Sequence, residues 1–381
     1  MERLKITPRK DWEKKVEALG FSFHSLDNIY WDESTVYEFS MGEILEIERV
    51  TNKLHQMCLD AVQYVIDNKL YAKLHIPDSF IPLIEDSWNN DRPAIYGRFD
   101  FAYKNGEIKL LEYNADTPTS LFEAAVVQWY WLQDYDESFD QFNSIHERLI
   151  SYWKFLGPYL KNNPKVHFSC VSDSLEDTIT TEYMRDTAVQ AALETDFIYI
   201  EDIGWDSNNN CFVDWNENNI DNIFKLYPWE WIINEDFGKN ILLDKNGTYW
   251  IEPAWKMVLS NKGILPILFE LNPYHSNLLP AYFDNANFSS GKKVVKKPLL
   301  SREGANIEIT QNRNIVGKSY GDYGSEGYIF QEFFDVINED GKYPVLGSWV
   351  IGGEAGGMGI RESDGLITDN LSRFVPHYIR K

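Results

Sequence analysis

The sequence has few cysteines, no long apolar run and no excess of positive charge. Its three cysteines, Cys58, Cys170 and Cys211, form no CxxC pair, so neither a disulfide framework nor a cysteine-based zinc site is expected. The longest apolar runs, AAVVQWYWL and GILPILF, are far too short to cross a bilayer, and the N-terminus is charged from its second residue, unlike a signal peptide. These absences predict a cytoplasmic protein with no membrane partner.

The balance of charges is acidic. The 36 lysines and arginines are outnumbered by 59 aspartates and glutamates, which gives a formal net charge of −23. This charge argues against nucleic acid or an anionic membrane as the main partner. It favours a cationic ligand, although an acidic surface also serves solubility alone. The seven histidines show no HExxH or other ligand spacing, so they are expected to be structural.

The rest of the composition indicates a globular protein, because 381 residues with 44% hydrophobic content can bury a core of two or three modules. Helical spacing over 42–68 predicts a long amphipathic helix. A strand at 165–171, a helix at about 175–194 and a following strand predict a strand–helix–strand unit. The fold class is therefore α+β, with an α/β module at about 124–234 set between two segments that supply a mixed sheet.

The stretch TPTSLFEAAVVQWYWL predicts another helix, beginning at Pro118 with Thr117 as its cap. Ser120 and Glu123 have the spacing of a capping box in the same stretch.

A hairpin precedes that helix in RFDFAYKNGEIKLLEYNADTPTS, which runs from Arg98 to Ser120. Alternate residues of a strand face the same side. A three-residue turn at 104–106 places Arg98 opposite Glu112 and puts four polar residues on one face, with the apolar residues Phe99, Phe101, Leu111 and Tyr113 on the other. A two-residue turn at 105–106 would split the polar set. Because burying charges is costly, the amphipathic register with the three-residue turn is the one expected.

The polar face of this hairpin has two interpretations. Asp100, Glu112 and Asn114 offer the oxygen ligands that Mg²⁺ takes, and Arg98 beside them can pair with phosphate oxygens. Alternatively, the face is solvated and carries only a cross-strand ion pair of Arg98 with Glu112.

Three later stretches carry further candidates. KKPLLSREGANIEI places Lys297 at the base of a glycine-bearing loop that could fold over phosphates, or could be an ordinary exposed hairpin. Lys256 lies among apolar residues, which is unusual for an unpaired lysine. GGMGIRES ends a strand in glycines and presents Arg361, without the strand–turn–helix setting of a dinucleotide site.

The strings GRFDF, LEYNADTPTS, EPAWK, KPLLSREGANI, YIFQEFF and GGMGIRES occur in this order over about 20–378. Together they resemble the glutathionylspermidine synthetase family, and in particular its stand-alone acid–amine ligases. The resemblance implies an ATP-grasp fold with a pre-ATP-grasp-like α/β domain. The ATP-grasp domain would comprise 1–123 and 235–381, with the metal hairpin early and the lid and nucleotide hinge late, and the α/β domain would comprise 124–234.

The resemblance also implies roles for individual residues. Two Mg²⁺ ions would be held by Asp100, Glu112 and Asn114. The residues implied to bind ATP are Arg98, Lys256, Lys297, Gln331, Glu332 and Arg361, of which the two arginines act catalytically on the transferred phosphate. Substrate contacts fall to Thr117, Thr119, Glu176 and Asp177.

The implied activity is ATP-dependent amide formation through an acyl phosphate, joining a small-molecule or peptide acid to an amine, with residues 301–307 as a lid. Fewer than 100 residues precede the hairpin, so the amidase of the bifunctional members is not expected. The sequence around Glu176 and Asp177 keeps only the family's outline, which leaves glutathione and spermidine open as substrates. An ATP-binding module without turnover, and a carbohydrate-active protein suggested by the 13 tryptophans, are the alternatives.

Overall fold

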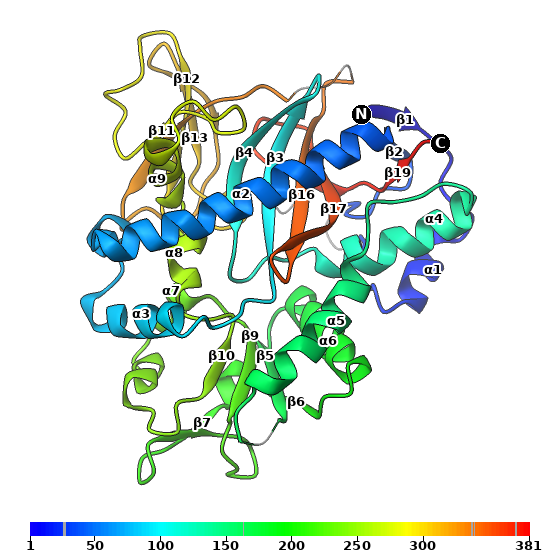
Figure 1. The fold of residues 1–381 in the computed structure, drawn as a ribbon. Helices are drawn as coiled ribbons and strands as arrows, with labels where there is room; N and C mark the ends of the chain where they lie inside the picture. The colour runs from blue at the N-terminus through cyan, green and yellow to red at the C-terminus, as the bar shows by residue number, and fades with distance from the viewer. Residues whose placement is uncertain (26–27, 163, 337, 339, 370–371) are drawn as a thin grey trace.

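A computed structural model of the chain describes residues 1–25, 28–162, 164–336, 338, 340–369 and 372–381. Figure 1 shows a long helix, α2 (Met41–Asp67), crossing a central sheet, with a second sheet beside it and a smaller sheet below. Within the described ranges, no helix has both the length and the apolar character needed to span a membrane.

The central sheet is antiparallel and has the strand order β18-β17-β16-β3-β4. One of its faces packs against α2, which begins at the capping box formed by Ser40 and Glu43 and lays its apolar side on Phe99, Phe101 and Tyr113. The opposite face is thereby left for polar residues. The strands are β3 (Tyr96–Lys104), β4 (Glu107–Asn114), β16 (Tyr343–Ile351), β17 (Glu354–Ser363) and β18 (Arg373–Phe374).

The turn between β3 and β4 differs from the prediction. It has two residues, Asn105 and Gly106, with φ of 53° and 82°, and this pair of positive φ values suits the asparagine–glycine turns of tight hairpins. The expected three-residue turn at 104–106 is therefore wrong. Arg98 lies opposite Asn114 rather than Glu112, and it is Asp100 that lies opposite Glu112.

A β-bulge nevertheless keeps the polar residues together. The register shifts between Asp100 and Phe101, because Asp100 pairs with Glu112 while Phe101 pairs with Leu110. Leu111 is the extra residue, and Leu110 occupies the buried apolar position that was expected for Leu111. One additional residue in β4 thus restores the alternation that a two-residue turn alone would have broken.

A second antiparallel sheet, ordered β11-β15-β12-β13-β14, lies beside the first. The loop between β12 and β13 contains the expected lid residues 301–307. The strands are β11 (Ala281–Tyr282), β12 (Lys293–Pro298), β13 (Glu308–Gln311), β14 (Asn314–Lys318) and β15 (Tyr328–Glu332).

The third large sheet is parallel, with the order β10-β9-β5-β6. The predicted strand–helix–strand unit is confirmed: β5 (Val166–Cys170) leads through α6 (Leu175–Gln190) to β6 (Thr195–Phe197). Helices α5 (Ile145–Leu156) and α6 cover one face of this sheet. Strand β10 (Tyr249–Ile251) pairs with β9 (Asn222–Leu226), although it follows residue 234, the predicted end of the α/β domain. The domain boundaries stay a prediction.

The remaining elements complete these layers. A three-stranded sheet, β1-β2-β19, brings the two chain ends close together (Figure 1). Its strands are β1 (Glu2–Lys5), β2 (Thr35–Phe39) and β19 (His377–Ile379). The other α-helices and strands are α1 (Trp12–Ala18), α3 (Ile81–Asn89), α4 (Gln128–Asp136), β7 (Gly204–Asp206), β8 (Cys211–Val213), α7 (Trp229–Ile232), α8 (Lys256–Ser260) and α9 (Ile264–Leu271).

The helix after the hairpin starts later than predicted. Its first helical residue is Leu121, and a π-helical turn over Glu123–Val127 leads into α4. Ser120 has a φ of 64°, a left-handed conformation that serine seldom adopts. The expected helix start at Pro118 and the capping box of Ser120 with Glu123 are therefore wrong. The Ser120 hydroxyl lies near Tyr30 and Arg361 instead.

A buried ion pair links the parallel sheet to the segment that follows β4. Lys225 of β9 donates to Asp116 Oδ1 at 2.8 Å and to the Tyr227 carbonyl at 2.9 Å, while the other Asp116 oxygen accepts from the Trp229 backbone amide. The two charged side chains are 0% and 1% exposed. Because both charges are removed from water, each depends on the other.

Replacing Asp116 with alanine should lower the free energy of unfolding by about 3–5 kcal/mol, because it leaves the Lys225 ammonium buried without its counter-ion. Urea unfolding measures the change. The exposed pair of Arg49 with Glu46 is the control, and Glu46→Ala should cost less than about 1 kcal/mol. The double variant Asp116→Ala/Lys225→Met should recover part of the loss; equal losses in the single and double variants would contradict this account.

Candidate active site

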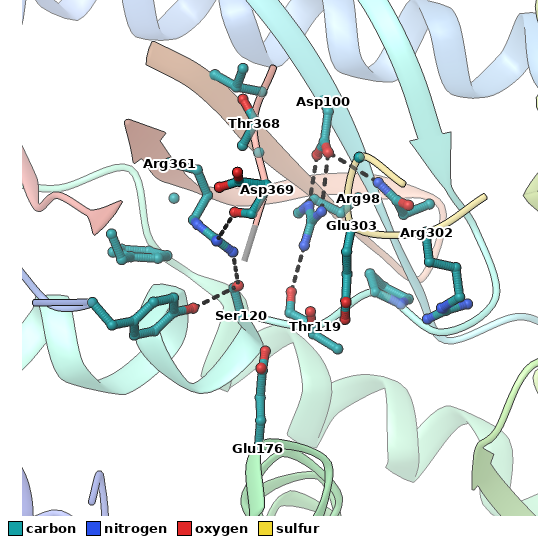
Figure 2. Close-up of a pocket in the computed structure, with 18 of the residues that line it drawn as sticks. Arg98, Asp100, Thr119, Ser120, Glu176, Arg302, Glu303, Arg361, Thr368 and Asp369 are labelled. Atoms are coloured by element: carbon teal, nitrogen blue, oxygen red, sulfur yellow. Dashed lines mark hydrogen bonds and ion pairs between the residues drawn. The ribbon is translucent and has the colours of Figure 1, made fainter. Parts of the chain in front are cut away.

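The polar face of the central sheet forms the wall of a cavity of about 300 Å³. Arg98 and Asp100 reach it from β3, Glu112 and Asn114 from β4, and Arg361 from β17. All four polar hairpin residues therefore share one face, as predicted, through the bulge rather than through the expected turn. Figure 2 shows Arg98, Asp100 and Arg361 pointing toward the space between the sheet and the loop that follows β4.

Arg98 and Asp100 form a bidentate ion pair, with Nε–Oδ1 and Nη2–Oδ2 distances of 2.7 and 3.1 Å. The third guanidinium nitrogen donates to the Thr119 carbonyl at 2.6 Å. Gly347 of β16 makes room for this arginine, since a Cβ there would lie 2.8 Å from Arg98 Cδ. Burial raises the pKa of Asp100 although the Arg98 charge opposes that rise.

Glu112 is held ionised by lysines. Its carboxylate lies 3.2 Å from Lys262 Nζ and accepts from Asn114 Nδ2 at 3.2 Å. Burial alone would raise the pKa of Glu112, but the charges of Lys262 and Lys297 outweigh it and lower the pKa to about 2. Lys262 was not among the predicted site residues. The sequence feature that could have identified Lys262 is the one that drew attention to Lys256: it is a lysine within a largely apolar stretch, MVLSNKGILPILF.

Lys297 belongs to a second, smaller cavity of about 120 Å³ that is lined by both five-stranded sheets and also by Asp100 and Glu112. Its ammonium donates at 2.8 Å to the Leu111 carbonyl and to Gln331 Oε1. Burial lowers the pKa of Lys297 to about 8, against the opposing charge of Glu112. The two cavities therefore meet at the hairpin carboxylates.

The predicted nucleotide hinge lies on the wall of this second cavity. Gln331 is buried in β15 and donates to the Leu110 carbonyl at 3.0 Å. Glu332 follows it and forms an ion pair with Lys292.

The loop over 301–307 closes one side of the larger cavity. Arg302 donates to the Thr117 carbonyl at 3.0 Å and lies 3.6 Å from the Glu230 carboxylate. Gly304 has a φ of 70°, and a Cβ there would lie 2.3 Å from the Thr368 carbonyl oxygen. Only glycine allows such a close approach, so the loop packs directly on the segment around Thr368.

Arg361 holds the opposite side. It donates to the Asp369 carbonyl at 2.9 Å, to the Ser372 carbonyl at 3.1 Å and to Ser120 Oγ at 3.3 Å. Thr117 and Thr119, the predicted substrate contacts, both line the cavity between Arg361 and the loop.

Carboxylates gather where α6 begins. Glu176 points from its first turn toward Thr119 and Ser120 (Figure 2), and burial raises its pKa. Burial and the charge of Glu176 raise the pKa of Asp177 to about 6 and that of the fully buried Glu123 to about 7. Glu123 accepts from the Tyr30 hydroxyl at 2.6 Å, and neither residue was predicted as part of the site.

Lys256 and Asp177 are the predicted site residues that line neither of these two cavities. Lys256 lies away from them. It is buried, and its ammonium donates at 2.8 Å to the carbonyls of Tyr96 and Ala115 and lies 3.2 Å from Glu252. These acceptors account for its charge within the protein interior. The other predicted site residues line one of the two cavities, and Asp177 lies next to Glu176 at the rim.

The hairpin donors fit a hard divalent cation. Asp100 and Glu112 face each other across the bulged register with carboxylate oxygens toward the cavities, and oxygen donors of this kind are what Mg²⁺ requires. Asn114 now donates its amide nitrogen to both carboxylates. With a cation between them, that amide would present its oxygen instead.

Comparison with known proteins gives consistent results. The family model for the glutathionylspermidine synthase preATP-grasp family matches residues 3–380. A protein of Haemophilus influenzae named "Putative acid--amine ligase" is 42% identical over 97% of both chains. Trypanothione synthetase of Crithidia fasciculata is 29% identical over 85% of this chain and 53% of its own length.

A bifunctional glutathionylspermidine synthetase/amidase of Escherichia coli is 27% identical over 88% of this chain and 58% of its own. The chain thus spans a little over half of these last two relatives and nearly all of the Haemophilus protein. On the family match and the 42% identity, the chain belongs to the glutathionylspermidine synthase family and is a carbon–nitrogen ligase.

Proposed function

We propose that the protein is an ATP- and Mg²⁺-dependent acid–amine ligase that forms an amide through an acyl phosphate. The observation that carries this proposal is the meeting of two cavities at Asp100 and Glu112, with Arg98, Lys262 and Lys297 around the two carboxylates. Fixed positive groups beside buried carboxylates provide the setting that a metal–triphosphate complex requires.

In this proposal ATP lies in the smaller cavity, in an ATP-grasp arrangement between the two antiparallel sheets. Gln331 and Glu332 hold the adenine at the base of that cavity. Lys262 and Lys297 bind phosphate oxygens, and Lys262 takes the role that the resemblance implies for Lys256, because its ammonium pairs with Glu112, which lines this cavity, whereas that of Lys256 pairs with the buried Glu252.

The remaining charged groups serve the transferred phosphate and the cation. Asp100, Glu112 and Asn114 would hold Mg²⁺, which when bound neutralises charge on the phosphates. Arg98 from β3 and Arg361 from β17 both face the larger cavity, where they stabilise the phosphate during transfer.

The chemistry proceeds in two displacements. An oxygen of the acid's carboxylate bonds to the γ-phosphorus of ATP, and the bond from that phosphorus to the β-phosphate oxygen breaks, releasing ADP. The amine nitrogen then bonds to the acyl carbon, phosphate leaves with the electrons of the carbon–oxygen bond, and the nitrogen loses a proton. The loop at 301–307 excludes water, which would otherwise hydrolyse the acyl phosphate.

The acid is proposed to lie at Thr117 and Thr119, close to Arg98, and the amine toward Glu176 and Asp177, whose carboxylates suit a cation. The names of the relatives make glutathione with spermidine the first pair to test, followed by other peptide acids and amines.

Asp100→Asn should lower metal-dependent turnover by about 10²-fold or more, because it removes a metal ligand and the partner of Arg98. ADP release over a panel of acids and amines measures this. Asp60→Asn, which changes an exposed aspartate of α2, is the control and should leave the rate unchanged. Undiminished turnover in Asp100→Asn would refute the metal assignment. ATP binding without ADP release on any pair would instead support a module without turnover.

Lys262→Met should mainly affect ATP binding, whereas Lys256→Met should mainly affect stability. The first should raise the KM for ATP by about tenfold or more with a smaller change in urea midpoint, because Lys262 pairs with Glu112 beside the cavities and Lys297 still compensates that carboxylate. The second should mainly lower the urea midpoint, because it leaves Glu252 and two carbonyls without their shared donor. Steady-state kinetics and urea unfolding of both variants decide between these roles, and a reversed pattern would restore the assignment to Lys256.

The pH dependence should report Lys297. Its ammonium form binds phosphate, and its pKa is lowered to about 8, so kcat/KM for ATP should fall as the pH rises through about 8. Lys297→Arg keeps the charge well above that pH, since arginine stays protonated, and should move the decline to higher pH. Identical profiles for the two proteins would show that another group titrates.

A further inference from the structure

A third cavity, of about 260 Å³, lies at the edge of the parallel sheet where its strands begin. His167, near the start of β5, and Asp214, just after β8, are among the residues that line it. The other end of β5 leads toward α6, whose first turn carries Glu176 into the candidate active site. This third cavity is therefore separate from the ligase site and lies toward the lower part of Figure 1.

The fold brings a histidine and two aspartates together there from separate strands. His167 on β5 is the register partner of Asp196 on the parallel neighbour β6, so the two side chains share one face of the sheet. Val166 and Phe168 occupy the other face, which packs against α5 and α6. One ligand atom from each of His167, Asp196 and Asp214 falls within 4.8 Å of the others.

The loop after β8 fixes Asp214. Its Oδ1 accepts from the backbone amides of Asn216 and Asn218, both at 2.9 Å. The other oxygen, Oδ2, accepts from Asn218 Nδ2 at 3.3 Å and lies 3.6 Å from His167 Nε2. The separation exceeds a hydrogen bond, so the carboxylate faces the ring without closing on it.

His167 is the observation that points to a ligand. It is 3% exposed, and within the described part of the chain neither ring nitrogen has a hydrogen-bond partner. Buried polar groups in native proteins are normally paired, and imidazole is a frequent metal ligand. Burial and the charge of Lys165 lower the pKa of His167, against the opposing charges of Asp196 and Asp214.

We propose that His167, Asp196 and Asp214 bind a divalent transition-metal ion of the Zn²⁺ class. One imidazole nitrogen and two carboxylate oxygens, with the fourth position filled by water, form a donor set that zinc accepts, whereas Mg²⁺ prefers oxygen ligands alone. The ion ties the loop after β8 to strands β5 and β6 and so stabilises the small parallel sheet. The proposal does not depend on the ligase function.

Lys165 provides an internal check. Its ammonium lies 3.0 Å from Asp196 Oδ2, on the carboxylate that the ion would share. Zinc must therefore compete with this lysine for Asp196, and Lys165→Met should tighten zinc binding while the histidine variants abolish it.

The experiment is a Zn²⁺ titration of the full chain at neutral pH by calorimetry, with excess Mg²⁺ present to occupy the hairpin carboxylates. The wild type should bind one Zn²⁺ saturably and show a higher thermal midpoint with zinc than without. His167→Ala and Asp196→Asn should lose both effects. The matched control is Glu194→Gln, which removes one negative charge from the same cavity but no proposed ligand, and it should retain both.

The outcomes separate the possibilities. Absence of saturable zinc binding by the wild type would overturn the proposal. So would binding that persists in His167→Ala, or that weakens equally in Glu194→Gln and Asp196→Asn, since the cavity would then attract the ion only by its charge. Circular dichroism confirms that each variant is folded, and Asp214→Asn replaces His167→Ala if the latter is not.

Discussion

One extra residue in β4 decides which face of the central sheet the polar side chains of the β3–β4 hairpin occupy. With the two-residue turn at Asn105 and Gly106 and no bulge, Glu112 and Asn114 would point into the aromatic layer beneath α2, where an ionised carboxylate loses its hydration without gaining a partner. The bulge at Leu111 turns them to the side of Arg98 and Asp100. Its carbonyl also accepts from Lys297, so the same residue that sets the register helps to dock the second sheet onto the first.

Once the carboxylates face that side, the arrangement of the surrounding cations follows from electrostatics. Asp100 is compensated by Arg98 from its own strand, and Glu112 by Lys262 and Lys297 from outside the hairpin. Each pair is partly withdrawn from water, where unpaired charges are costly. The site is thus a set of paired opposite charges. In the proposed function its carboxylates would exchange these partners for a cation and its cations would exchange theirs for phosphates.

The sequence predicted the elements and the shared face, but not the contacts that span distant segments. The amphipathic alternation around Phe99 and Tyr113 was sufficient to identify the face, whereas the bulge left no local signal and the turn was misjudged. Ser120 has the sequence of a cap, yet its φ of 64° and its contact with Arg361 depend on a strand more than 200 residues away. The grouping of His167 with Asp196 and Asp214 likewise has no signature in the local sequence, because the three residues come from separate segments and meet only in the folded sheet.

The buried lysines show most clearly why sequence alone could not assign roles. Within the described residues four lysines are buried, namely Lys225, Lys256, Lys262 and Lys297. Each has apolar residues nearby in the sequence, although Asn261 precedes Lys262 and Lys296 precedes Lys297. What separates them is the position of their acceptors. The ammonium groups of Lys225 and Lys256 bind carbonyls and carboxylates that are themselves buried, so these two lysines stabilise the fold. Lys262 and Lys297 end beside Glu112, which lines both cavities, and in the proposed function a phosphate of ATP would take the place of that carboxylate as their partner. A lysine that lies among apolar residues is therefore a signal of a paired charge, and only the location of its partner distinguishes a structural role from a functional one.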